Sequence, residues 1–84
     1  MRATYDPEVD ILYVTLRDEP VDHTRDVSRR RQYERGIDYA ADGALVGYEF
    51  MNASRGIDLE GLPHREELAS LLDRTRGLRI LQAG

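Results

Sequence analysis

The sequence predicts an α+β domain: an antiparallel sheet of about four strands, built from two β-hairpins, with one C-terminal amphipathic helix packed on a face. Two turn signals flanked by β-branched and aromatic residues predict the hairpins, and leucines at helical spacing predict the helix. Because 84 residues without an internal linker suit one core, we expect a single domain over residues 1–84. Its parts would be a β-hairpin core (1–55), a helix (62–76) and a short strand or tail (78–82).

The first turn signal is Asp6-Pro7, since Asp suits the first position of a turn and Pro fixes φ at the second. Pairing Tyr5 with Asp10 across a four-residue loop would set Ala3 opposite Leu12. This register predicts one apolar face for the hairpin.

The other face of this hairpin carries Ile11, Tyr13 and Thr15, which are too apolar to face only water. One helix cannot cover both faces of a sheet. We therefore expect a homodimer that buries part of this second face or pairs edge strands.

The second turn signal is Asp42-Gly43, which favours a type I′ hairpin with positive φ at both residues. Pairing outward from it sets Ile37 opposite Tyr48 and Tyr39 opposite Val46. Between the two hairpins, residues 21–27 resemble a short, polar edge strand, and an arginine-rich connection follows.

The helix signals begin at Pro63, a residue that suits the first helical position. Acidic residues follow in the first turn, and Gly77 suits the C-terminal stop. The apolar stripe expected to face the sheet consists of Leu68, Leu71, Leu72 and Thr75.

Acidic residues gather at the tip of the first hairpin, at Asp6, Glu8 and Asp10. They lack the Gly and the distant bidentate Glu of a calcium loop, so turn chemistry explains them better than a metal site does. Asp38 and Glu49 are diagonal neighbours in the second hairpin. Such a pair suits either a salt bridge with an arginine or a Mg²⁺ or proton-sharing site.

No catalytic set is apparent: His23 and His64 lie far apart, and no serine has the setting of a nucleophile. The sequence therefore predicts no catalytic residue, no bound metal and no cofactor. The only basic cluster consists of Arg29, Arg30, Arg31 and Arg35, with Tyr33 among them. It fits a solvated connection or a set of phosphate contacts.

The formal net charge is −4, which argues against broad nucleic-acid binding. There is no cysteine, no signal-peptide pattern and no apolar run of about 20 residues, the length that spans a bilayer. We expect a cytoplasmic protein without membrane contact.

Two motifs resemble those of a bacterial family, domain of unknown function 2283, the YuzE-like small proteins. "YDPEVDILYV" is similar to the family's opening Y-D-x-E-x-D-x-L-Y-I. "GIDYAADGALVGYEFMNAS" is similar to its second motif, V-D-Y-D-x-x-G-x-x-V-G-I-E-I-L-x-A-S. The matching positions are Tyr5, Asp6, Glu8, Asp10, Leu12, Tyr13, Asp38, Tyr39, Asp42, Gly43, Val46, Gly47, Glu49, Ala53 and Ser54.

This sequence departs from the family pattern in its arginine-rich "SRRRQYER" link and in the helix after Gly56. The resemblance implies a shared sheet but no established activity. Members resemble small partner proteins encoded beside toxin-like genes, which implies a protein partner encoded nearby.

The leading hypothesis is a non-catalytic protein-binding module, with an antitoxin-like role as the form of it that the resemblance suggests. The alternatives are a metal-dependent enzyme or ligand-binding protein that uses Asp38 and Glu49, and a weak nucleic-acid binder that uses the arginine cluster.

Overall fold

The computed structural model describes residues 1–75 and contains one antiparallel sheet of five strands in the order β1-β2-β5-β4-β3. The strands are β1 (Arg2–Asp6), β2 (Ile11–Thr15), β3 (His23–Asp26), β4 (Arg35–Tyr39) and β5 (Leu45–Met51). A 3-10 turn, η1 (Ala53–Arg55), and one helix, α1 (Arg65–Asp73), follow the sheet. The α+β class and the antiparallel sheet are confirmed.

The predicted count of four strands is wrong because β3 pairs with β4 along its whole length. β3 lies within residues 21–27, the segment that the sequence suggested as a short polar edge strand but left out of the count, and all four of its residues are exposed. It lies at the edge of the sheet, where polar and charged residues discourage pairing with other chains.

The first hairpin forms in a register two residues away from the predicted one. Tyr5 pairs with Leu12 and Ala3 with Val14, so the connecting loop is residues 7–10. Asp10 ends that loop with a left-handed backbone at φ 56°. Because side chains alternate with a period of two, this shift keeps the same side chains on the same face.

The second hairpin pairs Ile37 with Tyr48 as predicted, but Tyr39 pairs with Leu45 because a bulge intervenes. The type I′ prediction is wrong: in this turn only Gly43 has a positive φ, 87°. Its amide donates to the carbonyl of Ala40 at 2.9 Å. This pattern is a type I turn followed by a left-handed glycine, the usual three-residue hairpin connection.

Replacing Gly43 with valine should lower the free energy of unfolding by about 1–3 kcal/mol, the cost of forcing a β-branched residue to positive φ. A Cβ at Gly43 would meet no atom within 4 Å, so the cost comes from the backbone alone. Thermal melting checks it. Gly43→Asn is the matched control and should lose less, because Asn tolerates this conformation. Equal melting of Gly43→Val and the parent would contradict the turn.

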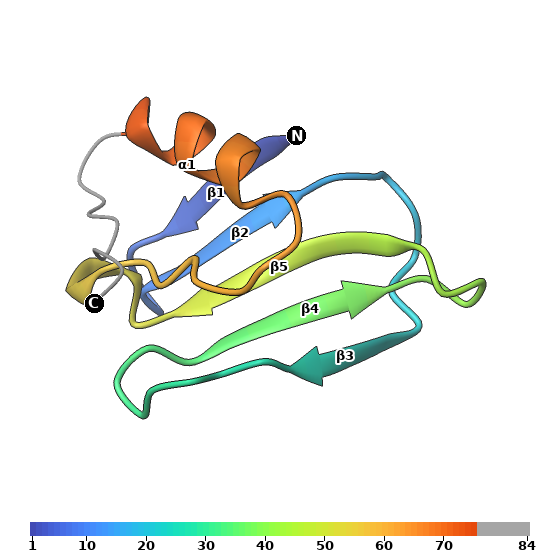
Figure 1. Cartoon of the computed structure of the whole chain (residues 1–84), viewed down its shortest axis with the longest axis horizontal. Helices are drawn as coiled ribbons and strands as arrows, with labels where there is room; N and C mark the ends of the chain where they lie inside the picture. The colour runs from blue at the N-terminus through green and yellow to red at the C-terminus, as the bar shows by residue number, and fades with distance from the viewer. Residues whose placement is uncertain (76–84) are drawn as a thin grey trace.

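The core lies between one face of the sheet and the layer formed by α1 and the chain from η1 to the helix (Figure 1). Leu12, Val14, Tyr48 and Phe50 are buried on that face. The chain between η1 and α1 also contributes buried side chains to the core, those of Ile57, Leu59 and Leu62.

The helix begins at Arg65, two residues after the predicted first helical position at Pro63. Pro63 instead lies in the preceding turn, where its carbonyl accepts a hydrogen bond from the Tyr48 hydroxyl at 2.7 Å. His64 precedes the helix with φ 59°. Burial raises the pKa of Tyr48 to about 12, with smaller contributions from Tyr39 and Glu67.

Leu68 and Leu72 are buried against the sheet, while Leu71 and Thr75 are partly exposed. The last helical residue is Asp73. The predicted stop at Gly77 and the strand or tail at 78–82 lie outside the described residues. No helix within residues 1–75 is long and apolar enough to cross a membrane.

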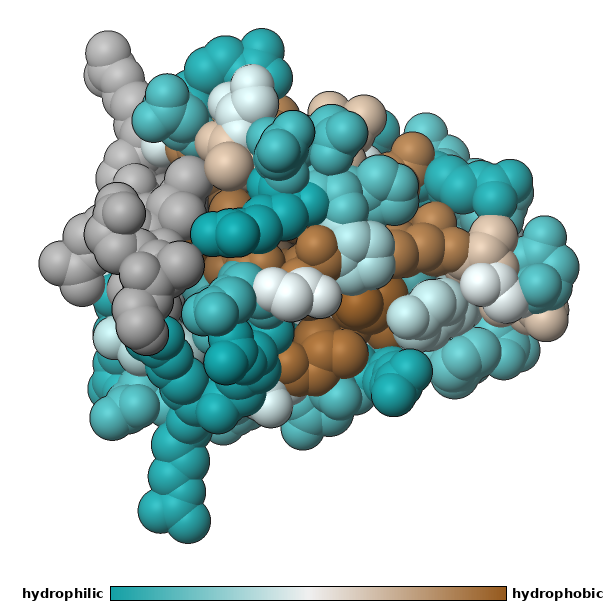
Figure 2. All heavy atoms as spheres, viewed as in Figure 1, coloured by the Kyte–Doolittle hydropathy of each residue, from teal (hydrophilic) through white to brown (hydrophobic). Residues whose placement is uncertain are grey.

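The helix covers only part of its face of the sheet. In Figure 2 hydrophobic residues gather near the middle of the visible face and hydrophilic residues surround them. Partly buried side chains beside the core include Val27, Tyr39 and Leu45. A helix of nine residues is too short to cover five strands.

Candidate functional site

The opposite face of the sheet, which we call the open face, has no element of residues 1–75 packed on it (Figure 1). Its side chains alternate with those of the core. Ile11, Tyr13 and Thr15 project there because their neighbours Leu12 and Val14 are buried on the other side. All three are partly buried, so the open face is neither fully solvated nor covered.

A hydrogen-bonded network crosses three strands of the open face. The Tyr13 hydroxyl on β2 donates to Asp38 Oδ2 on β4 at 2.8 Å. The Thr24 hydroxyl on β3 donates to Asp38 Oδ1 at 2.5 Å. Asp38 is only 2% exposed although its face of the sheet is open. Both of its oxygens thus have a donor within the sheet.

Gly47 on β5 makes this network possible, because it lies between Tyr13 and Asp38. Asp38 pairs directly with Gly47. A Cβ built on Gly47 would lie 2.6 Å from the Tyr13 hydroxyl and 2.6 Å from the Val14 carbonyl oxygen. The tyrosine ring therefore crosses β5 where a side chain is missing.

Glu49 lies beside the network, diagonal to Asp38 as the sequence predicted, and pairs directly with Tyr13. Burial raises the pKa of Glu49, and the charge of Asp38 raises it further. Burial also raises the pKa of Tyr13, followed by its hydrogen bond to Asp38. The phenol therefore stays protonated and keeps donating to the carboxylate.

Replacing Glu49 with glutamine should raise the melting temperature at pH 7, because it removes a charge disfavoured by burial and by Asp38. A raised pKa means that the folded state holds this proton more tightly than the unfolded state. Protonation of Glu49 therefore stabilises the folded chain. This stabilisation is complete at pH values below the ordinary pKa of 4.5 and is lost as the pH rises through the raised pKa of the folded state.

Melting curves of the parent and Glu49→Gln at pH 7 and pH 3 check this sign. The difference should shrink at pH 3, where Glu49 is protonated in both states. Glu34→Gln, at an exposed position, is the control and should shift the curves little at either pH. A parent more stable than Glu49→Gln at pH 7 would contradict the expected electrostatics.

The open face does not gather metal ligands. Within residues 1–75 no group of three or more His, Cys, Asp or Glu side chains is placed to hold an ion. Asp38 and Glu49 share a face, but Tyr13 and Thr24 already occupy both Asp38 oxygens. In the described part of the chain, neither carboxylate forms an ion pair with an arginine.

The acids of the first hairpin serve the loop. Asp6 Oδ1 accepts a hydrogen bond from the Glu8 amide at 3.0 Å, and Glu8 is exposed. Asp10 accepts bonds from the Tyr5 hydroxyl (2.7 Å), the Ser54 amide (2.8 Å) and the Ser54 hydroxyl (2.6 Å). The bonds from Ser54 and Tyr5 lower the pKa of Asp10. The hydrogen bonds from Ser54 to Asp10 therefore hold η1 against the loop of the first hairpin.

The two histidines have separate surroundings. His23 Nδ1 lies 2.9 Å from the Asp22 carboxylate, and its ring stacks on Tyr39. His64 Nδ1 lies 3.1 Å from the Tyr48 hydroxyl. Neither ring bonds to a serine, so the described residues form no Ser-His pair.

The arginine cluster divides into two parts. Arg29 and Arg31 are exposed and Arg30 is partly exposed, whereas Arg35 is only 3% exposed. The Arg35 guanidinium donates to the carbonyls of Val27 (2.8 Å), Asp58 (2.7 Å) and Glu60 (2.6 Å). Arg35 therefore lies in the interior, away from any phosphate contact at the surface.

The other residues that the sequence analysis singled out contribute to the core, to a turn or to a strand. Leu12 is in the core, and Asp42 Oδ1 accepts the Ala44 amide at 2.9 Å in the second turn. Gly43 completes that turn, and Tyr39 lies at the end of β4.

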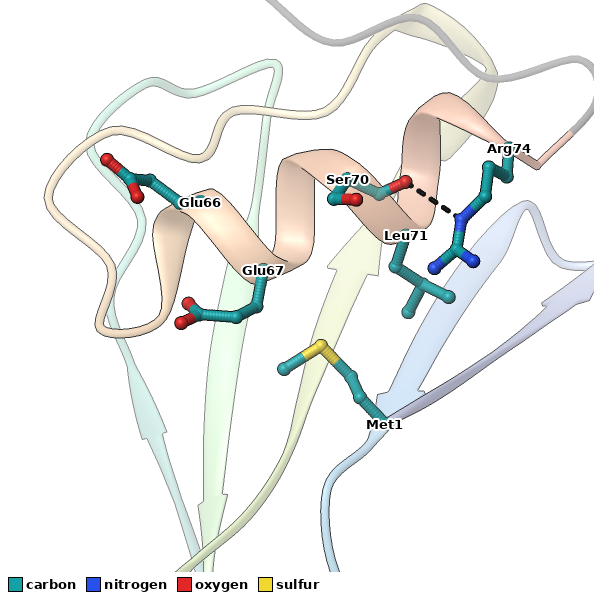
Figure 3. Close-up of a pocket in the computed structure, with 6 residues that line it drawn as sticks. All are labelled: Met1, Glu66, Glu67, Ser70, Leu71 and Arg74. Carbon is teal, nitrogen blue, oxygen red and sulfur yellow. Dashed lines mark hydrogen bonds between the residues drawn. The ribbon is translucent and has the colours of Figure 1, made fainter.

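A surface cavity of about 420 Å³ lies between α1 and the first residue of the chain (Figure 3). The Met1 and Leu71 side chains point toward each other there, and Arg74 Nε donates to the Ser70 carbonyl at 3.2 Å. Glu66 and Glu67 lie at the other end of the helix, with Glu66 directed away from Met1. This cavity includes no residue of the open-face network.

A family model described as "Protein of unknown function (DUF2283)" matches residues 2–54, which is more than half of the chain. The chain belongs to this family. No curated protein and no solved structure matches it. The DUF2283 match spans all five strands and ends in η1, so α1 lies outside it. The Tyr13–Asp38–Thr24 network, Gly47 and Glu49 all lie inside the DUF2283 segment.

Sequence reasoning found Tyr13, Asp38 and Glu49 separately but missed that Tyr13 bonds to Asp38. It also missed Thr24 as a partner and Gly47 as the gap between them. The available signal was the strand pairing: once β2 pairs with β5, the only side-chain-free position between Tyr13 and Asp38 is Gly47.

Proposed function

We propose that this DUF2283 chain is a non-catalytic protein-binding module whose binding surface is the open face. The observation that supports this most strongly is an uncovered sheet face with a row of partly buried side chains, Ile11, Tyr13 and Met51. A sheet face with apolar side chains commonly packs against another layer.

The shape of the open face suits a macromolecule better than a small ligand. Small ligands favour concave sites. On the open face the missing side chain of Gly47 would leave a hollow, but the Tyr13 side chain lies across Gly47 and fills that space. The hydrogen bonds of Asp38 are satisfied inside the sheet, so a partner can cover this carboxylate without leaving it unpaired.

The partner that we propose is a second copy of the chain, giving a homodimer. Ile11 pairs with Met51 at one end of the open face, while Glu49 and Asp38 lie toward β4. A twofold axis near Ile11 would pack the apolar row against its own copy and hold Asp38 of one copy away from Asp38 of the other, while Asp6, which pairs with Ile11, would lie at the rim of the contact. A domain of this size also has a thin core that gains from a partner.

Size-exclusion chromatography with light scattering tests the dimer. The parent should show twice the monomer mass at high micromolar concentration. Ile11→Glu should be a folded monomer by circular dichroism, because it places a charge at the centre of the proposed contact. Val9→Glu, at a 58% exposed position in the hairpin loop, is the matched control and should remain a dimer.

A parent that stays monomeric would contradict the homodimer. A dimer that survives Ile11→Glu would show that another surface, such as an edge strand, makes the contact. The resemblance also suggests a protein partner encoded nearby, as for an antitoxin. Binding of the purified product of a neighbouring gene, lost in Ile11→Glu and kept in Val9→Glu, would test that role on the same face.

A further inference from the structure

A second surface feature lies at the connection between β3 and β4, and none of the residues that line it belongs to the Tyr13–Asp38–Thr24 network. There the chain borders a cavity of about 420 Å³. The residues that line it are Asp26, Ser28, Arg29, Arg30, Arg31 and Glu34. This volume lies within the ordinary range of about 300–1,000 Å³ for small-molecule sites.

Hydrogen bonds to β4 hold this connection in a defined shape. The Ser28 hydroxyl oxygen accepts the Arg35 amide at 2.9 Å, and the Val27 amide donates to the Arg35 carbonyl at 3.0 Å. Further along, the Tyr33 amide donates to the Arg30 carbonyl at 3.1 Å and closes a turn. The backbone that carries the arginines is therefore organised before any ligand arrives.

The arginines at this cavity are only partly neutralised. Arg29 Nη1 lies 2.8 Å from Glu60 Oε2. Arg30 and Arg31 have no ion pair with any residue among 1–75. The Asp26 carboxylate accepts the Ser28 amide at 2.8 Å and so caps its own turn.

The positive charges of Arg29 and Arg30 repel the charge of the buried Arg35. Burial lowers the pKa of Arg35, Asp58 opposes this change, and the charges of Arg29 and Arg30 lower the pKa further. An anion placed beside Arg29 and Arg30 would relieve this repulsion.

We propose that this cavity binds the phosphate group of a small phosphorylated molecule, with Arg30 and Arg31 as its main donors. The planar guanidinium presents paired N–H groups that match phosphate oxygens, and such charge-assisted bonds are strong. Arg29 would share its charge between the ligand and Glu60.

A small ligand fits the surroundings better than a nucleic-acid backbone does. Asp26 and Glu34 border the same cavity, and the chain carries a net charge of −4. A long polyanion would have to cross these carboxylates, whereas one phosphate group can sit between the arginines.

Thermal melting and isothermal titration calorimetry with inorganic phosphate and pyrophosphate test the proposal on the full chain. The melting temperature should rise with millimolar pyrophosphate more than with sodium chloride of equal ionic strength. The variant R30Q/R31Q should weaken pyrophosphate binding at least tenfold. The matched control R17Q/R25Q removes the same charge at exposed positions outside the cavity and should bind as the parent does.

Three results would overturn the proposal: equal shifts with pyrophosphate and sodium chloride, unchanged binding by R30Q/R31Q, or equal weakening by R17Q/R25Q. A single-stranded oligonucleotide provides a further arm. If it binds more than tenfold tighter than pyrophosphate and depends on Arg30 and Arg31, the site serves nucleic acid instead. Circular dichroism of each variant confirms that the chain is folded.

Discussion

Replacing Gly47 with alanine should destabilise the protein strongly, by about 1–3 kcal/mol or more. The added Cβ would lie 2.6 Å from the Val14 carbonyl oxygen, a backbone atom that cannot rotate away, and 2.6 Å from the Tyr13 hydroxyl. For a domain of this size each kcal/mol lowers the melting temperature by roughly 4–8 °C. Thermal melting followed by circular dichroism measures the loss.

The control for this substitution is Gly61→Ala. Gly61 has a positive φ of 77° but open space around its Cβ position, so alanine there reports the backbone cost alone. The Gly47 variant should lose more. Removing the tyrosine ring in Tyr13→Ala/Gly47→Ala should not restore the parent's stability, because the contact with Val14 remains. A Gly47→Ala protein that melts like the parent would refute the close approach of β2 and β5.

Replacing Arg35 with methionine should have a still larger effect, about 3–5 kcal/mol, because it leaves a buried carboxylate without its cation. Arg35 and Asp58 are each 3% exposed, and Arg35 Nη1 lies 3.6 Å from Asp58 Oδ1. Asp58 Oδ2 is buried and has no hydrogen-bond partner. With about 5–15 kcal/mol of total stability in an ordinary domain, this loss leaves little margin. Urea unfolding measures it.

Two comparisons separate buried charge from lost packing. Arg35→Met/Asp58→Leu should recover part of the loss, because no charge remains in the interior. Recovery should be incomplete, since the carbonyls of Val27 and Glu60 still lack their donor. Arg17→Gln breaks the exposed pair with Glu19 and should cost less than about 1 kcal/mol. Equal losses in Arg17→Gln and Arg35→Met would contradict a structural role for the buried pair.

Much of the sheet was predictable from local signals. The alternation of Leu12 and Val14 with Ile11 and Tyr13 gave the correct faces even though the hairpin register was two residues off. Alternation constrains a register only to the nearest even shift. The exact register depends on the left-handed Asp10, and a sequence does not display such a backbone conformation.

The errors come from residues whose role depends on distant contacts. Arg35 looked like part of a solvated cluster, yet it is buried because carbonyls more than 20 residues away accept its N–H groups. Ile57 and Leu59 alternate with Asp58 and Glu60 over only four residues before Gly61, too short a pattern to predict that these side chains and Leu62 are buried. The candidate site was found only as separate residues, because Tyr13 and Asp38 meet across β5.

The hydrogen bonds between Asp10 and Ser54 have a consequence for the order of folding. The β1–β2, β3–β4 and β4–β5 pairings each join strands that follow one another, so they form with short loop closures. The β2–β5 pairing and the Asp10–Ser54 hydrogen bonds instead join residues at the two ends of a long intervening chain segment. Non-local contacts of this kind are slow to form, because loop entropy is lost before they stabilise the chain. We therefore expect the hairpins to form early. The formation of the β2–β5 pairing and of the Asp10–Ser54 hydrogen bonds should then limit the folding rate.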